Sequence, residues 1–196
     1  MAKVVIVDAG GANIGSVRYA LRRLGAEASL SSDAGVIRAA THVVLPGVGA
    51  AAPGMRRLRE AGLIDVVRRL ARPVLGVCLG MQLLFDHSDE GDVPCLGVLP
   101  GRLRRFDGAD VRVPHMGWNS LRMERPSRLL AGIRTGEFAY FVHSYAAPVT
   151  ADTLASCDYG GAFSAVVQCG NFYGAQFHPE RSADVGARLL ANFLEL

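Results

Sequence analysis

Residues 73–85 read PVLGVCLGMQLLF, and this stretch decides how the rest of the chain is interpreted. An apolar strand turns at Cys78 into an apolar helix, and glycines stand two residues before and two residues after the cysteine. This pattern has the form of a nucleophile elbow, in which the glycines permit a tight, strained turn that exposes the thiol. The beginning of the helix offers unpaired N–H groups that favour a thiolate. A buried structural cysteine is the alternative, because free cysteines are common in cores. The elbow favours a nucleophile, which needs a base elsewhere in the chain.

Length, composition and cysteine spacing describe an ordinary soluble domain. The chain has 196 residues, 50% of them hydrophobic and 20% charged, which predicts one folded domain over residues 1–196. The opening apolar run is too short for a signal peptide, and no later run is long enough to span a bilayer, so we expect a cytoplasmic protein without membrane association. The four cysteines lack Cys-x-x-Cys spacing, which argues against a metal site and a disulfide framework.

The basic residues are almost all arginine, and the net charge is +3. Arginine pairs at 22–23, 56–57 and 68–69 fall within predicted helices, where they most simply form solvated outer faces. A basic cluster also lies at 102–112, but only Phe106 accompanies it. A nucleic-acid surface would combine a concentrated basic face with several aromatic residues, so we expect no nucleic-acid partner.

Strands and helices alternate before the elbow. The apolar pattern predicts a helix with Asn13 as its N-cap, helical sequence from about 55 to 71 that breaks near Gly62, and strands at 3–8, 27–31, 41–45 and 73–77. This order is typical of a parallel sheet covered by helices, in which ligands bind at the carboxyl ends of the strands. The loop Pro46-Gly47-Val48-Gly49 and Cys78 both follow strands. We therefore expect one shared site, with N–H groups of the loop free to form an oxyanion hole.

A dinucleotide-binding fold is the alternative interpretation of the first unit. Residues 10–15 nearly match the phosphate-binding fingerprint of such folds, and Asp33 lies where an acid could bind a ribose. However, Ala12 replaces the middle glycine, which would let a pyrophosphate approach the backbone. Near matches are frequent at strand-to-helix turns, so this interpretation ranks second.

The chain changes character after the elbow. Residues 86–92 are interpreted as a solvated polar loop, and residues 184–196 as a final helix with one apolar face. Between them, residues 158–161 have the composition of a hairpin turn. Short β-like pieces occur at 101–106, 139–142, 154–158, 162–169 and 172–176. We expect these pieces to form an antiparallel extension of the sheet.

Only one of the five histidines is followed by an acid placed to orient it. His178 comes after an apolar strand in the sequence His178-Pro179-Glu180. Proline biases the preceding residue toward an extended conformation, in which residues two apart face the same way. Glu180 can then hold one imidazole nitrogen while the other faces the thiol. A surface His–Glu pair is the alternative, but with Cys78 the three residues form a nucleophile, a base and an orienting group.

These motifs together resemble the class I, or triad, glutamine amidotransferases. Gly-x-Cys-x-Gly and His-Pro-Glu mark the catalytic residues of that flavodoxin-like α/β family. The resemblance narrows to glutaminases that serve imidazole glycerol phosphate synthase in histidine biosynthesis, and it covers almost the whole chain. It rests on five segments in order, at 46–49, 76–82, 114–119, 141–145 and 176–180.

The resemblance implies that glutamine is hydrolysed to glutamate and ammonia through a γ-glutamyl thioester on Cys78. The N–H of Leu79 and one in the 47–49 loop, taken as that of Val48, would stabilise the oxyanion. Gln82 lies four residues beyond Cys78, on the same face of the expected helix, although an ordinary polar helix residue is the alternative. The implied substrate-binding residues are Gly47, Gly49, Gln82, Ser144 and Tyr145.

A partner is implied by the same resemblance. It is a (βα)₈-barrel cyclase that uses the ammonia to make imidazole glycerol phosphate and an aminoimidazole carboxamide ribotide. The positions that match its interface are Asn13, Trp118, Tyr140 and Arg181. Trp118 is otherwise a core residue of a packed loop. The chain departs from the usual family residues at Ala9, Ala12 and Arg181, which affects the partner contact and leaves the triad unchanged. No metal or organic cofactor is implied.

Three competing functions are each open to a simple test. A stand-alone thiol hydrolase or peptidase would be active without any partner. A dinucleotide-binding module would bind a nicotinamide or flavin whether or not Cys78 is present. A non-catalytic scaffold would bind the partner but lack a reactive thiol. The complete Cys, His and Glu set favours the amidotransferase.

Overall fold

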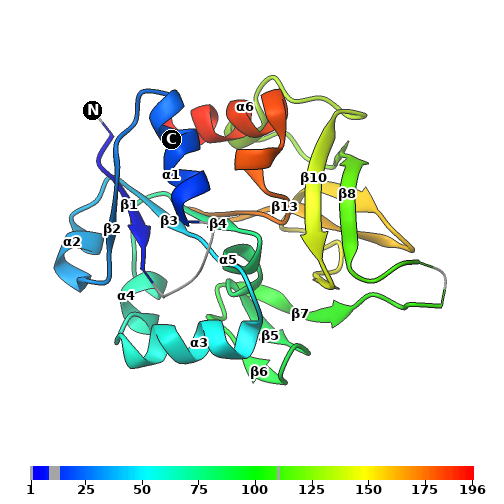
Figure 1. The fold of residues 1–196 in the computed structure, drawn as a ribbon, viewed down its shortest axis with the longest axis horizontal. Helices are drawn as coiled ribbons and strands as arrows, with labels where there is room; N and C mark the ends of the chain where they lie inside the picture. The colour runs from blue at the N-terminus through cyan, green and yellow to red at the C-terminus, as the bar shows by residue number, and fades with distance from the viewer. Residues whose placement is uncertain (1, 9–13, 110) are drawn as a thin grey trace.

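The computed structural model describes residues 2–8, 14–109 and 111–196, and its centre is an eight-stranded sheet (Figure 1). Five strands run parallel, in the order β2 (Ala28–Ser31), β1 (Val4–Val7), β3 (His42–Leu45), β4 (Val74–Val77) and β14 (Phe172–Ala175). Three antiparallel strands continue the sheet, namely β13 (Ala162–Cys169), β12 (Thr153–Asp158) and β9 (Arg122–Met123). The predicted α/β class, a mainly parallel sheet with an antiparallel extension, is confirmed.

Helices cover both faces of the parallel strands (Figure 1). On one face lie α1 (Ile14–Arg23) and α6 (Ala183–Leu194), and on the other lie α2 (Ala34–Arg38), α3 (Ala51–Glu60) and α4 (Ile64–Arg68). Successive strand residues point to opposite faces of a sheet. Accordingly Val4 and Ile6 pack in one apolar cluster with α1 and α6, and Val5 and Val7 in another with α2, α3 and α4. Both faces of the central strands β1, β3 and β4 are buried, which is why these strands are mostly apolar, whereas the edge strand β2 is partly exposed.

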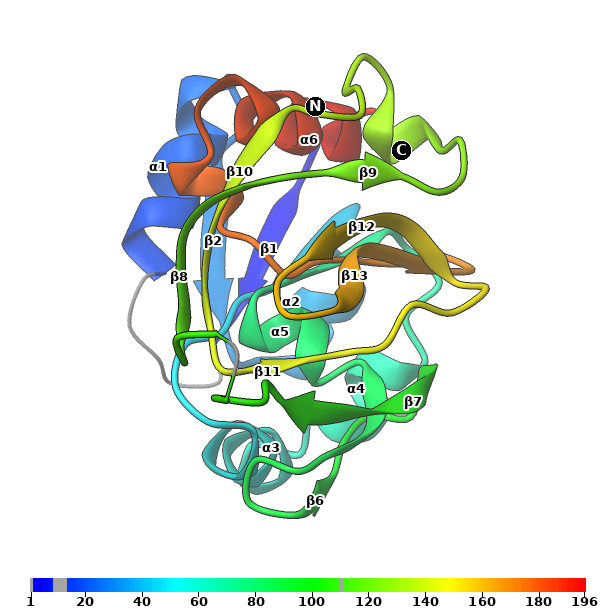
Figure 2. The ribbon, with the colours of Figure 1, turned by 90° about the vertical axis from the view of Figure 1, so that its right-hand side faces the viewer.

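Two smaller sheets flank the main one. One pairs β10 (Phe138–His143) with β8 (His115–Ser120), and the other contains β11 (Tyr145–Ala146), β7 (Leu99–Arg105), β5 (Phe85–Ser88) and β6 (Val93–Pro94). Residues 172–176, also expected in the antiparallel extension, instead form β14, which runs parallel to β4. The expectation that residues 101–106 and 139–142 extend the main sheet is wrong as well. Their partners are β5 and β8, which lie in segments that the sequence analysis interpreted as loops. Figure 2 shows β8 and β10 side by side, with the chain running on from β10 into β11.

The helix after Cys78 is shorter than predicted. It is a single turn, α5 (Leu79–Gln82), rather than a helix that reaches residue 85. It ends because the next carbonyls bond elsewhere: that of Leu83 accepts from the Leu96 N–H at 2.8 Å, and that of Phe85 from the Gly97 N–H at 2.9 Å. A single turn aligns few peptide dipoles, so its free N–H groups are what it offers to a ligand.

Most other predicted elements are found within a few residues of their expected bounds. The break near Gly62 separates α3 from α4, although α3 begins at Ala51 rather than near residue 55. The turn at 158–161 joins β12 to β13 as predicted. Two short 3₁₀ helices are η1 (Arg128–Leu130) and η2 (Pro179–Arg181). Asn13, predicted as an N-cap, lies outside the described residues, as do Ala9 and Ala12.

Asp33, a possible ribose ligand in the dinucleotide interpretation, has a local structural role. Its carboxylate accepts a hydrogen bond from the Val36 N–H at 2.8 Å and caps α2. Within the described ranges, no helix is both long and apolar enough to cross a bilayer. No group of three or more His, Cys, Asp or Glu side chains is arranged to hold a metal ion in this part of the chain.

Candidate active site

Cys78 stands at the junction of β4 and α5 with a strained backbone. Its φ is +52°, a region that side-chain-bearing residues rarely adopt. The strain is held by close packing, because a Cβ added at Gly80 would lie 1.8 Å from the Leu45 carbonyl oxygen. A Cβ at Gly47 would lie 2.7 Å from the Leu79 Cβ. The elbow is therefore pressed against the end of β3 and its glycine loop, which supports the predicted geometry of a nucleophile elbow.

A cavity of about 170 Å³ opens above the thiol. This is smaller than the roughly 300–1,000 Å³ of pockets for drug-sized ligands, and it suits a single small amino acid. Its lining comprises Val48, Gly49, Cys78, Leu79, Gln82, Glu90, Val142, His143, Ser144, Tyr145 and His178. Most of the predicted site residues thus meet here. Gly47 lies behind Leu79 instead, and Glu180 lies behind His178.

His178 and Glu180 form the predicted pair, although Glu180 lies in the 3₁₀ helix η2 rather than in an extended segment. His178 is extended, with φ −95° and ψ 98°, and its Nδ1 lies 2.9 Å from Glu180 Oε1. The Glu180 side chain is only 1% exposed. Burial alone would lower the pKa of His178, but hydrogen bonds and charge from Cys78 and Glu180 outweigh it and raise the pKa to about 10. At neutral pH, His178 is therefore an imidazolium beside the sulfur.

Ser182 fixes the backbone of the histidine, a role that the sequence analysis missed. Its side chain is fully buried, and its hydroxyl donates to the His178 carbonyl at 2.7 Å. The same hydroxyl accepts from the Tyr140 N–H at 2.9 Å, and the His178 N–H donates to the Tyr140 carbonyl at 2.9 Å. This closed set of three hydrogen bonds ties His178 to strand β10.

The carboxamide of Gln82 has a fixed orientation. Its Nε2 donates to the Tyr145 carbonyl at 2.8 Å and to Gln176 Oε1 at 3.0 Å. Both amide protons are then in use, so the oxygen is the atom left for a ligand. Gln176 was not singled out from sequence. It is fully buried, and its own amide nitrogen lies 3.9 Å from Cys78 Sγ.

Glu90 corrects the interpretation of residues 86–92 as a solvated loop. It lines the cavity, and its Oε2 accepts from the Ala51 N–H at 2.9 Å, at the N-terminus of α3. Burial raises its pKa, and the bond from Ala51 partly offsets that rise. In the sequence, Glu90 lies in a polar run between two apolar segments, and such a run is typical of a surface loop.

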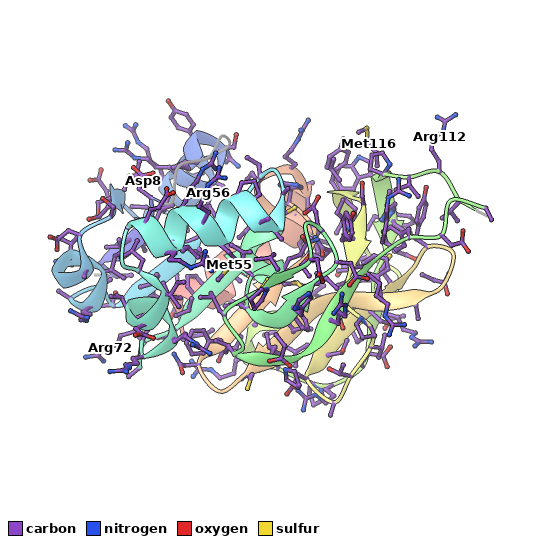
Figure 3. The ribbon with its side chains drawn as sticks, turned by 90° about the horizontal axis from the view of Figure 1, so that it is seen from below. Asp8, Met55, Arg56, Arg72, Arg112 and Met116 are labelled. Atoms are coloured by element: carbon purple, nitrogen blue, oxygen red, sulfur yellow. The ribbon has the colours of Figure 1, made fainter. Side chains whose placement is uncertain are left out.

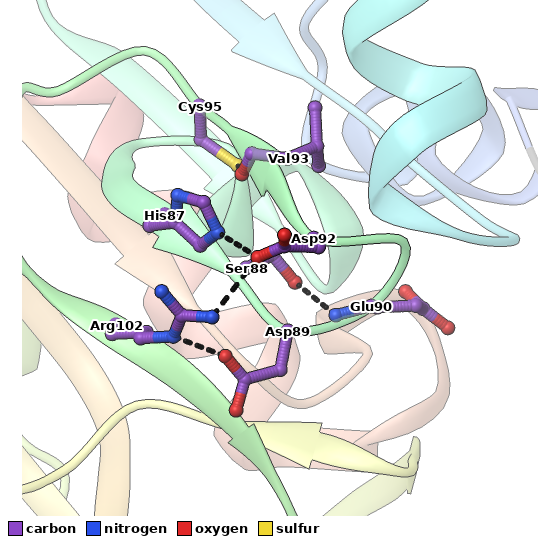
Figure 4. A network of polar contacts seen from close by, with 8 residues as sticks. All are labelled: His87, Ser88, Asp89, Glu90, Asp92, Val93, Cys95 and Arg102. Carbon is purple, nitrogen blue, oxygen red and sulfur yellow. Dashed lines mark hydrogen bonds and ion pairs between the residues drawn. The ribbon is translucent and has the colours of Figure 1, made fainter.

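A polar network holds the turn that carries Glu90 (Figure 4). Arg102 on β7 donates to Asp89 and, at 3.1 Å, to Asp92, whose carboxylate also meets His87 Nε2 at 2.9 Å. The buried hydroxyl of Ser88 accepts from the Glu90 N–H at 3.1 Å. These contacts fix both sides of the turn between β5 and β6. Glu90 therefore reaches the cavity from a hairpin whose turn is held in place by hydrogen bonds.

The predicted interface residues lie together, away from the cavity lining. Trp118 on β8 is 52% exposed, which excludes the core position considered for it, and its ring lies 5.8 Å from that of Tyr140 on β10. The Arg181 guanidinium lies 4.9 Å from the Tyr140 ring centre. Met116 and Phe138 on the same strand pair are also exposed, and Figure 3 shows Met116 projecting outward. Asn13 lies outside the described residues.

The other three cysteines have no place in this cavity. Cys78, Cys95, Cys157 and Cys169 are all free thiols. Burial raises the pKa of Cys95 to about 11 and that of Cys157 to about 12. These two thiols are therefore poor nucleophiles at neutral pH.

Comparison with known proteins gives a consistent family. A family model described as "Glutamine amidotransferase class-I" matches residues 5–196. The imidazole glycerol phosphate synthase subunit HisH of Xanthomonas euvesicatoria pv. vesicatoria is 61% identical over 197 residues, which cover 100% of this chain and 98% of that protein. The subunit of the same name from Xylella fastidiosa is 60% identical with the same coverage.

Solved structures agree with the fold. A crystal structure of a glutamine amidotransferase is similar, with a TM-score of 0.76, 25% identity and coverage of 97% of both chains. A putative GMP synthase protein of Thermoplasma acidophilum has a TM-score of 0.75 at 19% identity and covers 100% of this chain and 93% of its own. That second likeness concerns the fold alone.

Proposed function

The chain belongs to the class I glutamine amidotransferase family, and from this premise we propose that Cys78, His178 and Glu180 hydrolyse glutamine as a catalytic triad. The function is that of a glutamine amidotransferase in histidine biosynthesis, which supplies ammonia to a cyclase. The observation that carries the assignment of the triad is the strained Cys78 beside a charged, carboxylate-bound His178 at a cavity sized for one amino acid.

The first half-reaction uses the His178 imidazolium as an acid. The Cys78 sulfur bonds to the carboxamide carbon of glutamine, and negative charge develops on the amide oxygen. The C–N bond then breaks while His178 gives its proton to the departing nitrogen. The products are ammonia, a γ-glutamyl thioester and a neutral His178, which Glu180 keeps in one tautomer.

The second half-reaction uses that neutral imidazole as a base. His178 takes a proton from water, the water oxygen bonds to the thioester carbon, and the C–S bond breaks to release glutamate. In both steps, charge collects on one oxygen. We assign its stabilisation to the backbone N–H groups of Leu79 and Val48, because both residues line the cavity beside the sulfur.

Two side chains of the cavity suit the α-amino group of glutamine. Glu90 carries a carboxylate, and Gln82 presents an amide oxygen whose orientation its other bonds fix. An ammonium group that leaves water needs such acceptors. Gly49, Ser144 and Tyr145 complete the lining on the remaining sides, with Gly47 as support beneath Leu79.

The partner in this proposal is a (βα)₈-barrel cyclase that binds over β8 and β10. The exposed apolar side chains of Met116, Trp118 and Phe138 support that surface, because their burial would favour association. Tyr140, Arg181 and Asn13 would join it. We also infer that residues 1–196 act as one domain, since strands from both ends share one sheet. A cytoplasmic location fits a nucleophile that must remain a thiol.

The direct test is glutamate release by the purified chain, first alone and then with the barrel cyclase and its nucleotide ligand. We expect strong stimulation by the liganded cyclase, and no γ-glutamyl adduct on a Cys78→Ala variant by mass spectrometry. An adduct on another residue contradicts the assigned nucleophile. Release that the cyclase leaves unchanged contradicts the partner and favours a stand-alone hydrolase.

A further inference from the structure

Two buried histidines connect the β8–β10 pair to the cavity. His115 on β8 and His143 on β10 are direct partners in the antiparallel register, and they are 3% and 6% exposed. The His115 ring stacks between Phe141 and Tyr159, at centroid distances of 5.0 and 3.9 Å. His143 lines the cavity itself. The proposed mechanism uses neither imidazole.

Their hydrogen bonds run in one direction only. His143 Nδ1 lies 2.8 Å from the Tyr145 carbonyl oxygen, which can only accept, so this nitrogen carries the proton. His143 Nε2 lies 3.2 Å from His115 Nδ1, and in a neutral pair the latter must donate. His115 Nε2 is then an acceptor, 3.5 Å from the amide nitrogen of Asn119. That amide is fixed in turn, since its nitrogen donates to the Asp158 carbonyl and its oxygen accepts from the Ser120 N–H, each at 2.8 Å.

The series ends on the carbonyl that orients Gln82. The Tyr145 oxygen accepts from His143 on one side and from Gln82 Nε2 on the other. Because that carbonyl holds one of the two Gln82 amide protons, its position determines where the Gln82 oxygen points. The two histidines are thus connected to the Gln82 carboxamide through a single backbone group.

The surroundings keep both rings neutral. Burial lowers the pKa of His115 to about 4. Burial is also the main reason that the pKa of His143 falls to about 3. The hydrogen bond to Tyr145 raises this pKa, whereas the nearby His115 and His178 lower it further. Neutrality suits a site in which His178 carries the positive charge, because a second imidazolium would repel it.

We propose that His115 and His143 are positioning residues, which hold the Tyr145 carbonyl, and through it the Gln82 carboxamide, in the orientation that receives glutamine. The inference rests on the proposed function, since it takes glutamine as the ligand of the cavity. It predicts that both rings are Nδ1–H tautomers in the unliganded chain.

The first test is independent of activity. Long-range proton–nitrogen correlation spectra of the full chain, labelled in its histidines and recorded at neutral pH, distinguish the two neutral tautomers and the cation. The His115 and His143 signals are assigned by their loss in single substitutions. We expect the Nδ1–H form for both. An Nε2–H form or a cation at either residue overturns the proposal.

The second test is kinetic and uses the complex with the cyclase. His115→Leu leaves His143 Nε2 buried without a donor, and we expect the KM for glutamine to rise roughly tenfold with little change in kcat. His115→Asn places an amide nitrogen near the original Nδ1 and should restore KM to within roughly threefold of the original value. Phe163→Leu is the matched control, because Phe163 packs against both rings without a hydrogen bond to them.

The outcomes separate the inference from the function. If the unsubstituted complex releases no glutamate, the proposed function is wrong. The tautomers of His115 and His143, measured by spectroscopy, still show whether the series of hydrogen bonds exists. If the complex is active and His115→Leu leaves KM unchanged, or Phe163→Leu raises KM equally, the positioning role is wrong.

Discussion

His178 and His143 border the same cavity, yet one is charged and the other neutral. His178 follows β14 and meets the Glu180 carboxylate through its Nδ1, and its pKa rises to about 10 against the effect of burial. His143 ends β10 and meets a carbonyl through its Nδ1, and burial prevails there, lowering its pKa to about 3. Cys78 and the Glu180 carboxylate together compensate the buried imidazolium of His178, whereas the carbonyl dipole beside His143 does not compensate for burial.

The difference separates two tasks at one site. The charged ring can give a proton to a leaving group, whereas the neutral His143 ring donates its single N–H to the Tyr145 carbonyl and accepts at its other nitrogen. Closely spaced histidines therefore cannot be assigned roles from their distance to the thiol alone. The groups at both ring nitrogens decide which role is available: a thiol and a carboxylate at His178, and a carbonyl and a second imidazole at His143.

Removal of the charged ring should give the largest effect. His178→Asn deletes the acid and the base of both half-reactions, and we expect kcat to fall roughly a thousandfold to ten-thousandfold. The KM for glutamine should change little, because the ring is not assigned to substrate binding. Steady-state glutamate release in the complex measures both constants. A residual kcat within tenfold of the original, on the order of 1 kcal/mol, would mean that another group moves the proton.

Removal of only the charge behind that ring tests its cause. Glu180→Gln keeps the shape but not the carboxylate, so kcat should fall roughly a hundredfold. The pKa of His178 should fall as well, since Glu180 helps to raise it. The loss of activity at alkaline pH, where the imidazolium deprotonates, should then begin at a lower pH. A pH profile with an unmoved alkaline limb contradicts this account of the charge.

The second carboxylate of the site should affect binding instead. Glu90→Gln weakens the proposed contact with the substrate ammonium, and we expect KM to rise roughly tenfold while kcat stays within roughly threefold. Glu60→Gln, on the exposed end of α3, is the matched control. A fall in kcat with unchanged KM would assign Glu90 to the chemistry rather than to recognition.

The last effect concerns the free energy of unfolding rather than activity, and it has opposite signs for the two kinds of histidine. His115 and His143 bind fewer protons folded than unfolded, so their contribution is complete above pH 6.5 and falls as pH drops toward 4, by about 1.4 kcal/mol per pH unit for each. His178, whose pKa is raised, contributes stability below pH 6.5 that is lost as pH rises toward 10.

Urea unfolding from pH about 7 to about 5 measures the acid side of this dependence. His115→Asn should reduce the slope of unfolding free energy against pH, because about one proton fewer is taken up when the variant unfolds. If the slope is the same in that variant, His115 is not neutral and buried in the folded chain.

The parts of the site that sequence reasoning found carry unusual local chemistry. Cys78 is marked by its flanking glycines, and His178 by a proline and an acid at fixed spacing. The central parallel strands β1, β3 and β4 were found for a similar reason, since a strand buried on both faces is mostly apolar. Each of these signals lies within a few neighbouring residues.

The parts that sequence reasoning missed depend on distant segments. Glu90 lies in a run that is typical of surface loops, and contacts with Ala51, Ser88 and the turn held by Arg102 place it at the cavity. Ser182 and Gln176 gain their roles from contacts with β10 and α5. The pairing of β8 with β10 was missed because β8 lacks a continuous apolar run, although the apolar run of β10 was recognised as a strand.

The close approach at Gly80 has a genetic consequence. Every missense change at a glycine codon adds a Cβ, which here would lie 1.8 Å from a backbone oxygen of the neighbouring strand. A Cβ at Gly15 would approach only the Tyr19 ring, at 3.9 Å. In a library of all single substitutions, grown in a host whose only histidine supply depends on this gene, codon 80 should keep glycine alone while codon 15 accepts small residues. The close backbone contact at Gly80 thus limits which substitutions the elbow tolerates, independently of the residues that catalysis requires.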